Sequence, residues 1–127
     1  MLEDAKIMAT IAVSDLARSA EFYESKLGLK PSEMGRKDGE QVMLGADGSM
    51  LSLHEPLQRA SEHTAAAFMV EGDISTRVAQ LREAGIKFEE YDMPGLKTEN
   101  GIATSPSGKC AWFKDPDGNL LAVFSRQ

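Results

Sequence analysis

The sequence is poor in the residues that form disulfides, zinc clusters and nucleic-acid surfaces. It has one cysteine, Cys110, and two histidines, which excludes an internal disulfide and a cysteine-rich zinc site. Its 14 lysines and arginines are scattered and are outnumbered by 20 acidic residues, so neither nucleic acid nor an anionic membrane is an expected partner. No apolar run approaches the roughly 20 residues of a membrane span, and the first residues lack the features of a secretory signal. We therefore expect a cytoplasmic protein.

What the sequence does contain is a pattern repeated within 127 residues, a length that suits one globular domain. The segments IMATIAVSDLARSAEFYESKLGLK (7–30) and TAAAFMVEGDISTRVAQLREAGIK (64–87) each show an apolar strand, a capping residue, an amphipathic helix and a glycine. Gly28 and Gly85 stand 57 positions apart, and each suits the left-handed residue that follows a helix. The chain therefore carries two copies of one module.

Three strand-like stretches follow each predicted helix, so each half has the order βαβββ. They lie at about 30–35, 40–44 and 49–54, and at about 86–92, 110–114 and 119–125. The sequence thus predicts an α+β fold in a single domain, 1–127, with module one at about 6–55 and module two at about 63–125. The Pro-, Gly- and Ser-rich segment 93–108 is longer than an ordinary connection. This segment is either a lid or a disordered excursion.

Two motifs resemble one known family. VSDLARSAEFYESKLGL (13–29) is similar to the strand-to-helix signature of the vicinal oxygen chelate superfamily, the glyoxalase, bleomycin-resistance and extradiol dioxygenase fold. AWFKDPDGNLLAV (111–123) resembles the closing hairpin of that superfamily. The resemblance covers the whole chain. It implies that the sheets of two βαβββ modules form a cupped half-barrel, with the helices on its outer face and the ligand site on its concave face.

The resemblance also implies where a metal would bind. In the enzymes of this superfamily, a divalent metal is held by side chains on the first and last strands of the modules. The matching positions in this sequence are Met8, Ala65, Ser52 and Ala122. A thioether, a neutral hydroxyl and two methyl groups are poor ligands for the divalent metals of such enzymes. We therefore expect no metal site and no other cofactor.

Strand alternation extends the candidate site, because residues two apart share a face. A tight turn over each Asp-Gly sequence would pair Phe113 with Leu120, Ala111 with Ala122, Met43 with Met50, and Gln41 with Ser52. The expected ligand-binding positions are Met8, Thr10, Met43, Met50, Ser52, His54, Ala65, Ala67, Met69, Phe113, Leu120, Ala122 and Phe124. Flexible Met side chains suit a pocket for apolar or aromatic molecules. The alternative is that Met and Phe fill a closed core.

His54 is the one titratable group among these positions and a weak catalytic candidate. It is either a general base or a ligand-orienting group, or a hydrogen-bonded histidine at the end of a strand. No acid is placed by the sequence to orient it, so a Ser52–His54 nucleophile pair is not expected. Cys110 is expected on the opposite, helix-covered side of its strand, and Trp112 is expected on the same side, toward the helix layer or a partner.

The leading hypothesis is a metal-independent protein that holds an apolar or aromatic small molecule in its concave cavity, for resistance or sequestration. Two other classes stay open. One is a glyoxalase-like lyase or a dioxygenase-type enzyme with an unorthodox metal site or a metal-free mechanism based on His54. The other is a structural or regulatory module without a ligand. A homodimer is expected, because exposed sheet edges favour pairing.

Overall fold

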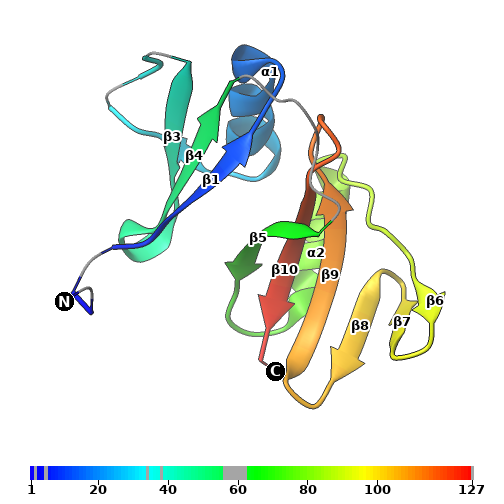
Figure 1. Cartoon of the computed structure of the whole chain (residues 1–127). Helices are drawn as coiled ribbons and strands as arrows, with labels where there is room; N and C mark the ends of the chain where they lie inside the picture. The colour runs from blue at the N-terminus through cyan, green and yellow to red at the C-terminus, as the bar shows by residue number, and fades with distance from the viewer. Residues whose placement is uncertain (2, 5, 34, 38, 56–62, 127) are drawn as a thin grey trace. The chain divides into compact units, whose positions relative to one another are not determined.

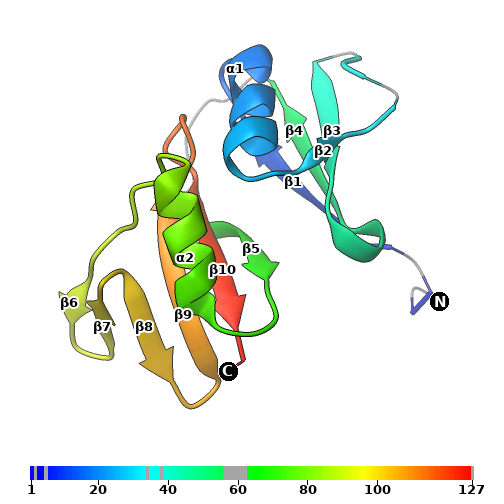
Figure 2. The ribbon, with the colours of Figure 1, turned by 180° about the vertical axis from the view of Figure 1, so that it is seen from behind.

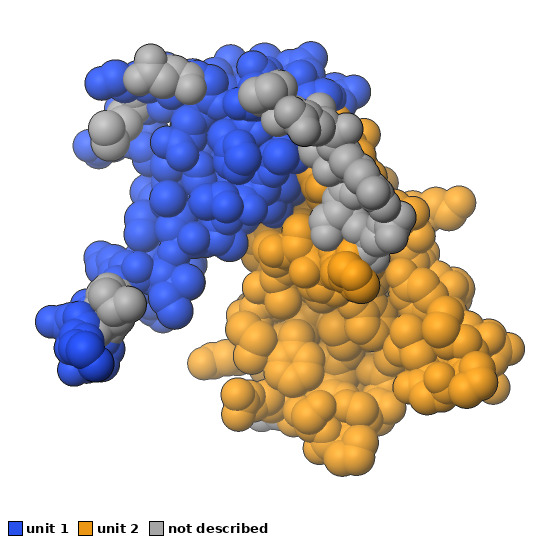
Figure 3. Space-filling view, viewed as in Figure 1, with its two compact units in different colours: residues 1–60 blue, residues 61–127 orange. Residues whose placement is uncertain are grey.

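The computed structural model describes residues 1–126 except 2, 5, 34, 38 and 56–62. The chain divides into two compact units, Met1–Ala60 and Ser61–Gln127, which are coloured separately in Figure 3. Each unit has one mixed sheet and one main helix. The α+β fold class predicted from the sequence is therefore confirmed, and each unit is described below by itself.

The first unit contains a four-stranded sheet (Figure 1). Its elements are β1 (Met8–Ala12), α1 (Leu16–Glu21), the π-helical turn η1 (Phe22–Lys26), β2 (Lys30–Pro31), β3 (Glu40–Leu44), the 3-10 turn η2 (Ala46–Gly48) and β4 (Met50–His54). The sheet order is β1-β4-β3-β2. β1 runs parallel to β4, and the other neighbours are antiparallel.

Helix α1 begins as its sequence predicts. The Asp15 side chain accepts a hydrogen bond from the Arg18 backbone N–H, which satisfies a free donor of the first turn. The Leu16 N–H donates to the Glu55 carboxylate at 2.6 Å, so a residue that follows β4 also holds the helix start. Leu16 and Ala20 of α1 and Leu53 of β4 are buried, and α1 contacts β3 and β4. The helix therefore covers one face of the sheet.

The second unit contains a six-stranded sheet. Its elements are β5 (Thr64–Met69), α2 (Ile74–Glu83), β6 (Asp92–Met93), β7 (Leu96–Glu99), β8 (Ile102–Ser105), β9 (Gly108–Lys114) and β10 (Leu120–Ser125). The sheet order is β5-β10-β9-β8-β7-β6, with β5 parallel to β10. Figure 2 shows α2 lying over β9 and β10, where Ile74 and Val78 are buried.

The inserted segment 93–108 is neither a lid nor a disordered excursion, so both expectations were wrong. β7 and β8 extend the sheet as an antiparallel hairpin whose turn is Asn100-Gly101, with φ of 53° and 82°. The Glu90 carboxylate accepts the Gly101 N–H and the Thr98 hydroxyl, each at 2.7 Å. Asn-Gly between two strands is a strong signal for a two-residue hairpin turn. The sequence therefore held the information that places this segment in the sheet.

A membrane-spanning helix would need a long apolar stretch, and none of the helices in the described residues has one.

Candidate functional site

The connections of the two Asp-Gly hairpins decide which side chains share a face. In the second unit the Asp115 N–H donates to the Asn119 carbonyl at 3.0 Å, and in the first unit the Gly45 N–H donates to the Ser49 carbonyl at 3.0 Å. Each hairpin is therefore closed around residues 116–118 or 46–48, one residue more than the expected pairing assumed. Because side chains alternate along a strand, one added residue moves each partner to the other face.

In the first unit this extra residue overturns two expected pairs. Val42 lies opposite Ser52, and Leu44 lies opposite Met50. Met43 lies opposite Leu51 and is fully buried on the helix-covered face of the sheet. The predicted pairing of Met43 with Met50, and of Gln41 with Ser52, was wrong, and Met43 leaves the candidate face.

The second unit shows the same correction. Trp112 lies opposite Ala122, and Cys110 lies opposite Phe124. Phe113 lies opposite Leu121, is 1% exposed, and makes an edge-to-face contact with Phe88 on the helix-covered side. The predicted pairs Phe113–Leu120 and Ala111–Ala122 were therefore wrong. The expected placement of Trp112 and Cys110 on the helix side was wrong as well.

Each sheet thus has one face that its helix leaves uncovered, called here the helix-free face. In the first unit the parallel pairing places Thr10 beside Ser52 and Met8 beside Met50. The helix-free face of the first unit carries Met8, Thr10, Ala12, Glu40, Val42, Leu44, Met50, Ser52 and His54. In the second unit the helix-free face carries Ala67, Met69, Cys110, Trp112, Lys114, Leu120, Ala122 and Phe124. Ala65 falls at a shift of register between β5 and β10.

Exposure varies along these faces. Met8 is 40% exposed and Met69 is 61% exposed, and Ala67 is exposed beside Ala122. Ala122 itself is only 3% exposed, so its small side chain does not leave an empty floor. Large apolar side chains in contact with solvent are therefore found on the β1 and β5 edges of these faces.

The four positions that match the superfamily's metal ligands do not form a donor set. Met8 and Ser52 lie on neighbouring strands of the first unit, and Ala122 lies on β10 of the second. The Ser52 hydroxyl donates to the Glu40 carboxylate at 2.5 Å. Across the part of the chain that the structure describes, no three His, Cys, Asp or Glu side chains gather where they could hold a metal. The residues present do not fit the metal that the family implies.

Glu40 is a candidate site residue that reasoning from the sequence missed. It lies directly opposite His54 across the β3–β4 ladder, and its carboxylate accepts the Ser52 hydroxyl. Directly opposed residues share a face with Cβ atoms about 5 Å apart. An acid therefore does stand beside His54. The number of residues in the η2 connection could have located it, because that number decides which residues of β3 lie opposite which residues of β4.

The hydroxyl of Ser52 is directed to Glu40 and not to His54. A nucleophilic serine needs a base that accepts its proton within hydrogen-bond reach. The arrangement therefore does not support a Ser52–His54 nucleophile pair, in agreement with the sequence-based interpretation. Burial raises the pKa of the Cys110 thiol, against a smaller opposing effect of the Ala111 N–H, so this thiol is a weak nucleophile at neutral pH.

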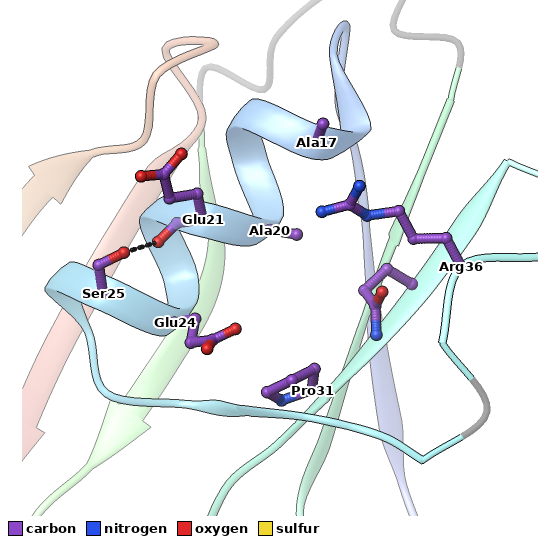
Figure 4. Close-up of a pocket in the computed structure, with 8 residues that line it drawn as sticks. Ala17, Ala20, Glu21, Glu24, Ser25, Pro31 and Arg36 are labelled. Carbon is purple, nitrogen blue, oxygen red and sulfur yellow. Dashed lines mark hydrogen bonds between the residues drawn. The ribbon is translucent and has the colours of Figure 1, made fainter.

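A separate cavity of about 690 Å³ lies in the first unit, on the helix-covered side (Figure 4). Figure 4 shows Ala17 and Ala20 of α1 on one side and Arg36 across from them. The lining residues are Ala17, Ala20, Glu21, Glu24, Ser25, Pro31, Arg36 and Gln41. None of the predicted ligand-binding residues lines this cavity. Its wall is formed largely by charged and small side chains.

Comparison with curated proteins finds two related enzymes. Biphenyl-2,3-diol 1,2-dioxygenase 3 of Rhodococcus globerulus is 30% identical over 82 residues, which are 65% of this chain and 37% of that enzyme. The chain thus matches little more than a third of the dioxygenase's length. Metallothiol transferase FosB of Shouchella clausii (strain KSM-K16) is 28% identical over 118 residues, covering 90% of this chain and 75% of that protein.

Among solved structures, TnmS3, an antibiotic binding protein from Streptomyces sp. CB03234, superimposes with a TM-score of 0.69 at 19% identity. The match covers 98% of each chain and shows a common fold. The family model of the Glyoxalase/Bleomycin resistance protein/Dioxygenase superfamily matches residues 7–123. The two repeated strand–helix–strand units and this match confirm the resemblance, and the chain belongs to the Glyoxalase/Bleomycin resistance protein/Dioxygenase superfamily.

Proposed function

We propose that this chain is a small-molecule binding protein of the glyoxalase/bleomycin-resistance type. It binds an apolar or aromatic compound on the helix-free faces of its sheets and needs no metal to do so. Its biological role is resistance or sequestration, in which the bound compound is an antibiotic or a toxic metabolite. It acts as a homodimer.

The observation that carries this proposal is the chemistry of the four positions where the family's enzymes hold their metal. Met8, Ser52, Ala65 and Ala122 offer one thioether and one hydroxyl, and that hydroxyl is already hydrogen-bonded to Glu40. Hard divalent metals prefer carboxylate, carbonyl or water ligands, and borderline ones such as zinc and iron(II) also prefer imidazole. A chain that keeps the family's fold without its donor set is suited to hold a ligand by packing.

The exposed apolar side chains support the same proposal. Met8 and Met69 are 40% and 61% exposed, although burying such a side chain contributes about 1.5–3 kcal/mol. Both lie on helix-free faces, next to half-buried Met50 and Phe124. Methionine adapts its shape to irregular or planar partners. An aromatic compound bound on either face would cover the exposed methionine of that face.

Two of the related proteins point to the class of ligand. TnmS3 is described as an antibiotic binding protein, and FosX of Listeria monocytogenes, which has a TM-score of 0.66, as a fosfomycin resistance protein. Their identities of 19% and 17% are low, so their ligands do not transfer. They support resistance or sequestration as the class of function to test first.

Metal independence is tested by a thermal-unfolding screen with zinc, nickel, manganese and iron(II). A ligand at 100 times its Kd stabilises the folded state by about 2.7 kcal/mol, so a bound metal would raise the Tm. We expect no change in Tm and no stoichiometric metal by elemental analysis. The proposal would be contradicted if the protein contained about one metal ion per chain and if a chelator removed that metal and lowered the Tm.

The binding face is tested with a library of aromatic natural products and a blocking variant. Ala122→Phe is a poor choice, because Ala122 is 3% exposed and overpacking would destabilise the fold by about 1–3 kcal/mol. Ala67 is exposed and lies beside Ala122, so Ala67→Phe covers the face without overpacking. Ala84, exposed at the end of α2, supplies the control Ala84→Phe. Compounds that bind the helix-free face of the second unit should raise the Tm of Ala84→Phe as they raise that of the wild type, but should not raise the Tm of Ala67→Phe.

A second candidate function is an enzyme whose acid–base group is His54. The observation that favours it is Glu40 directly opposite His54, because a carboxylate next to an imidazole can orient it and stabilise its protonated form. A lyase or dioxygenase with an unorthodox metal site would need further ligands besides this pair. Turnover of any screened substrate that His54→Ala eliminates, with unchanged Tm, would favour the enzyme over the binding protein.

A further inference from the structure

Apart from Thr10 beside Ser52, the helix-free face of the first unit is apolar except at the end where β3 begins and β4 ends. Three polar side chains meet there: Glu40 on β3, and Ser52 and His54 on β4. We propose that these three residues bind the protonated amine of an otherwise apolar or aromatic ligand. This inference rests on the proposed function, that the helix-free face binds a small molecule, and it adds the chemical class of that molecule.

The position of the carboxylate is the first argument. The Ser52 hydroxyl donates to Oε2 of Glu40, and Ser52 is fully buried, so it holds one carboxylate oxygen in place. The Glu40 side chain is otherwise exposed, which leaves Oε1 accessible to a ligand. A carboxylate can accept hydrogen bonds at both oxygens. The serine therefore orients an acceptor that is still available.

The charge of Glu40 is the second argument. Within the described ranges, neither of the ion pairs found involves Glu40. An ammonium group would form a charge-assisted hydrogen bond with the carboxylate, which is about twice as strong as a neutral one. His54 lies directly across the ladder on the same face, so its imidazole is a neighbour of the proposed amine position. An ammonium has three donors, and each carboxylate oxygen can accept one of them.

The surroundings of the polar group give the third argument. Val42 and Leu44 continue along β3 on the same face, and Met50 lies opposite Leu44. Met8 pairs with Met50 from the neighbouring strand and is 40% exposed. A ligand with an amine at one end and an apolar body would place the amine at Glu40 and the body along these side chains. An anionic ligand would be repelled by the same carboxylate.

The test compares three probes that share one ring system. 1-Naphthylmethylamine, protonated at pH 7, is titrated against ¹⁵N-labelled protein beside neutral 1-naphthalenemethanol and anionic 1-naphthoate. We expect the amine to bind about tenfold more tightly than the alcohol, the equivalent of about 1.4 kcal/mol. The naphthoate should bind most weakly. The largest shifts should occur at backbone amides of β3 and β4.

Two variants weaken the proposed amine site in different ways. Glu40→Gln keeps the shape and removes the charge, and Ser52→Ala keeps the charge and removes the bond that orients it. Glu40→Gln should abolish the preference for the amine, and Ser52→Ala should reduce it. Glu24→Gln is the matched control, because Glu24 lines the cavity on the helix-covered side and its loss should change nothing. If Glu40→Gln has a lowered Tm, its altered binding could reflect damage to the fold. The titration of Ser52→Ala then tests by itself whether the preference for the amine depends on this site.

The outcomes separate this inference from the proposed function. Equal affinity for amine and alcohol, or an unchanged preference in Glu40→Gln, would overturn the amine site while binding of the alcohol still supports the apolar site. Loss of the preference in Glu24→Gln would also overturn it and would place the amine in the other cavity. If no probe shifts any amide of the helix-free faces, both the inference and the proposed function fail.

Discussion

Asp115 holds the turn that sets the register of the closing hairpin, and its removal is the most direct test of that register. Its Oδ1 accepts the N–H groups of Asp117 and Asn119, each at 2.9 Å. Its Oδ2 accepts the side-chain amide of Asn119 at 3.0 Å. Asp115 and Asn119 are 5% and 3% exposed. The carboxylate thus holds Asn119, the residue immediately before β10.

The cost of Asp115→Ala follows from these contacts. The Asp117 N–H is partly exposed and can hydrogen-bond to water instead, so losing its bond to Asp115 costs little stability. The two Asn119 donors are buried, and a buried donor left unsatisfied costs about 1–3 kcal/mol, with bonds to charged acceptors at the upper end. We expect the free energy of unfolding to fall by about 3–5 kcal/mol. Asp115→Asn keeps one acceptor oxygen and should cost about 1–2 kcal/mol.

Urea unfolding followed by the fluorescence of Trp112, the only tryptophan in the chain, measures this change. Trp112 lies on β9, the strand that leads into the turn. The control is Asp92→Ala, an exposed acid in the same unit, which should change stability by no more than about 0.5 kcal/mol. If Asp115→Ala costs no more than Asp92→Ala, the carboxylate does not hold the turn, and our account of the register is wrong.

Four further outcomes are expected. Gly101→Ala should lower the free energy of unfolding by about 1–3 kcal/mol, because φ is +82° and the new Cβ would lie 3.0 Å from the Phe88 Cβ; unchanged urea midpoints would contradict this. The pKa of Glu90 is lowered by the Thr98 hydroxyl and then by the Gly101 N–H, so its stabilisation is present above the unfolded-state pKa, about 4.3, and is lost as the pH falls through the lower folded-state pKa. On acidification below that value the Tm of the wild type should fall more than that of Glu90→Gln. Burial raises the pKa of Cys110, so an aromatic disulfide reagent at pH 8 should react with it more slowly than with free cysteine, until urea unfolds the protein. Light scattering should show a particle about twice the 13.8 kDa chain mass, and a monomer at micromolar concentration would count against the proposed dimer.

The local sequence was sufficient to predict the helices and most of the strands. Asp15 and Asp73 cap the two helices as expected, and Gly28 and Gly85 adopt positive φ of 79° and 97°. Capping and left-handed turns depend on a few neighbouring residues, so they can be read directly from a short segment. The same is true of Asn100-Gly101, whose hairpin signal lay in the sequence and was overlooked.

The membership of each sheet face was decided by the tertiary structure. Spacing along a strand shows which residues alternate, but pairing between strands depends on how the connecting turn closes. The bonds from Asp115 to Asn119 and from Gly45 to Ser49 add one residue to each connection. That single residue moved Trp112 onto the candidate face and Phe113 away from it.

Glu40 shows the same limit at the site itself. It is separated from Ser52 by 12 positions in the chain, and no local pattern marks it as a partner of His54. The contact exists because β3 and β4 pair across η2 in one register and not in the neighbouring one. The repeat predicted the elements, and the resemblance of two motifs implied the family and the four positions that lack metal donors. The grouping of an acid, a hydroxyl and an imidazole required strand pairing, because only backbone hydrogen bonds between distant segments set which side chains face one another.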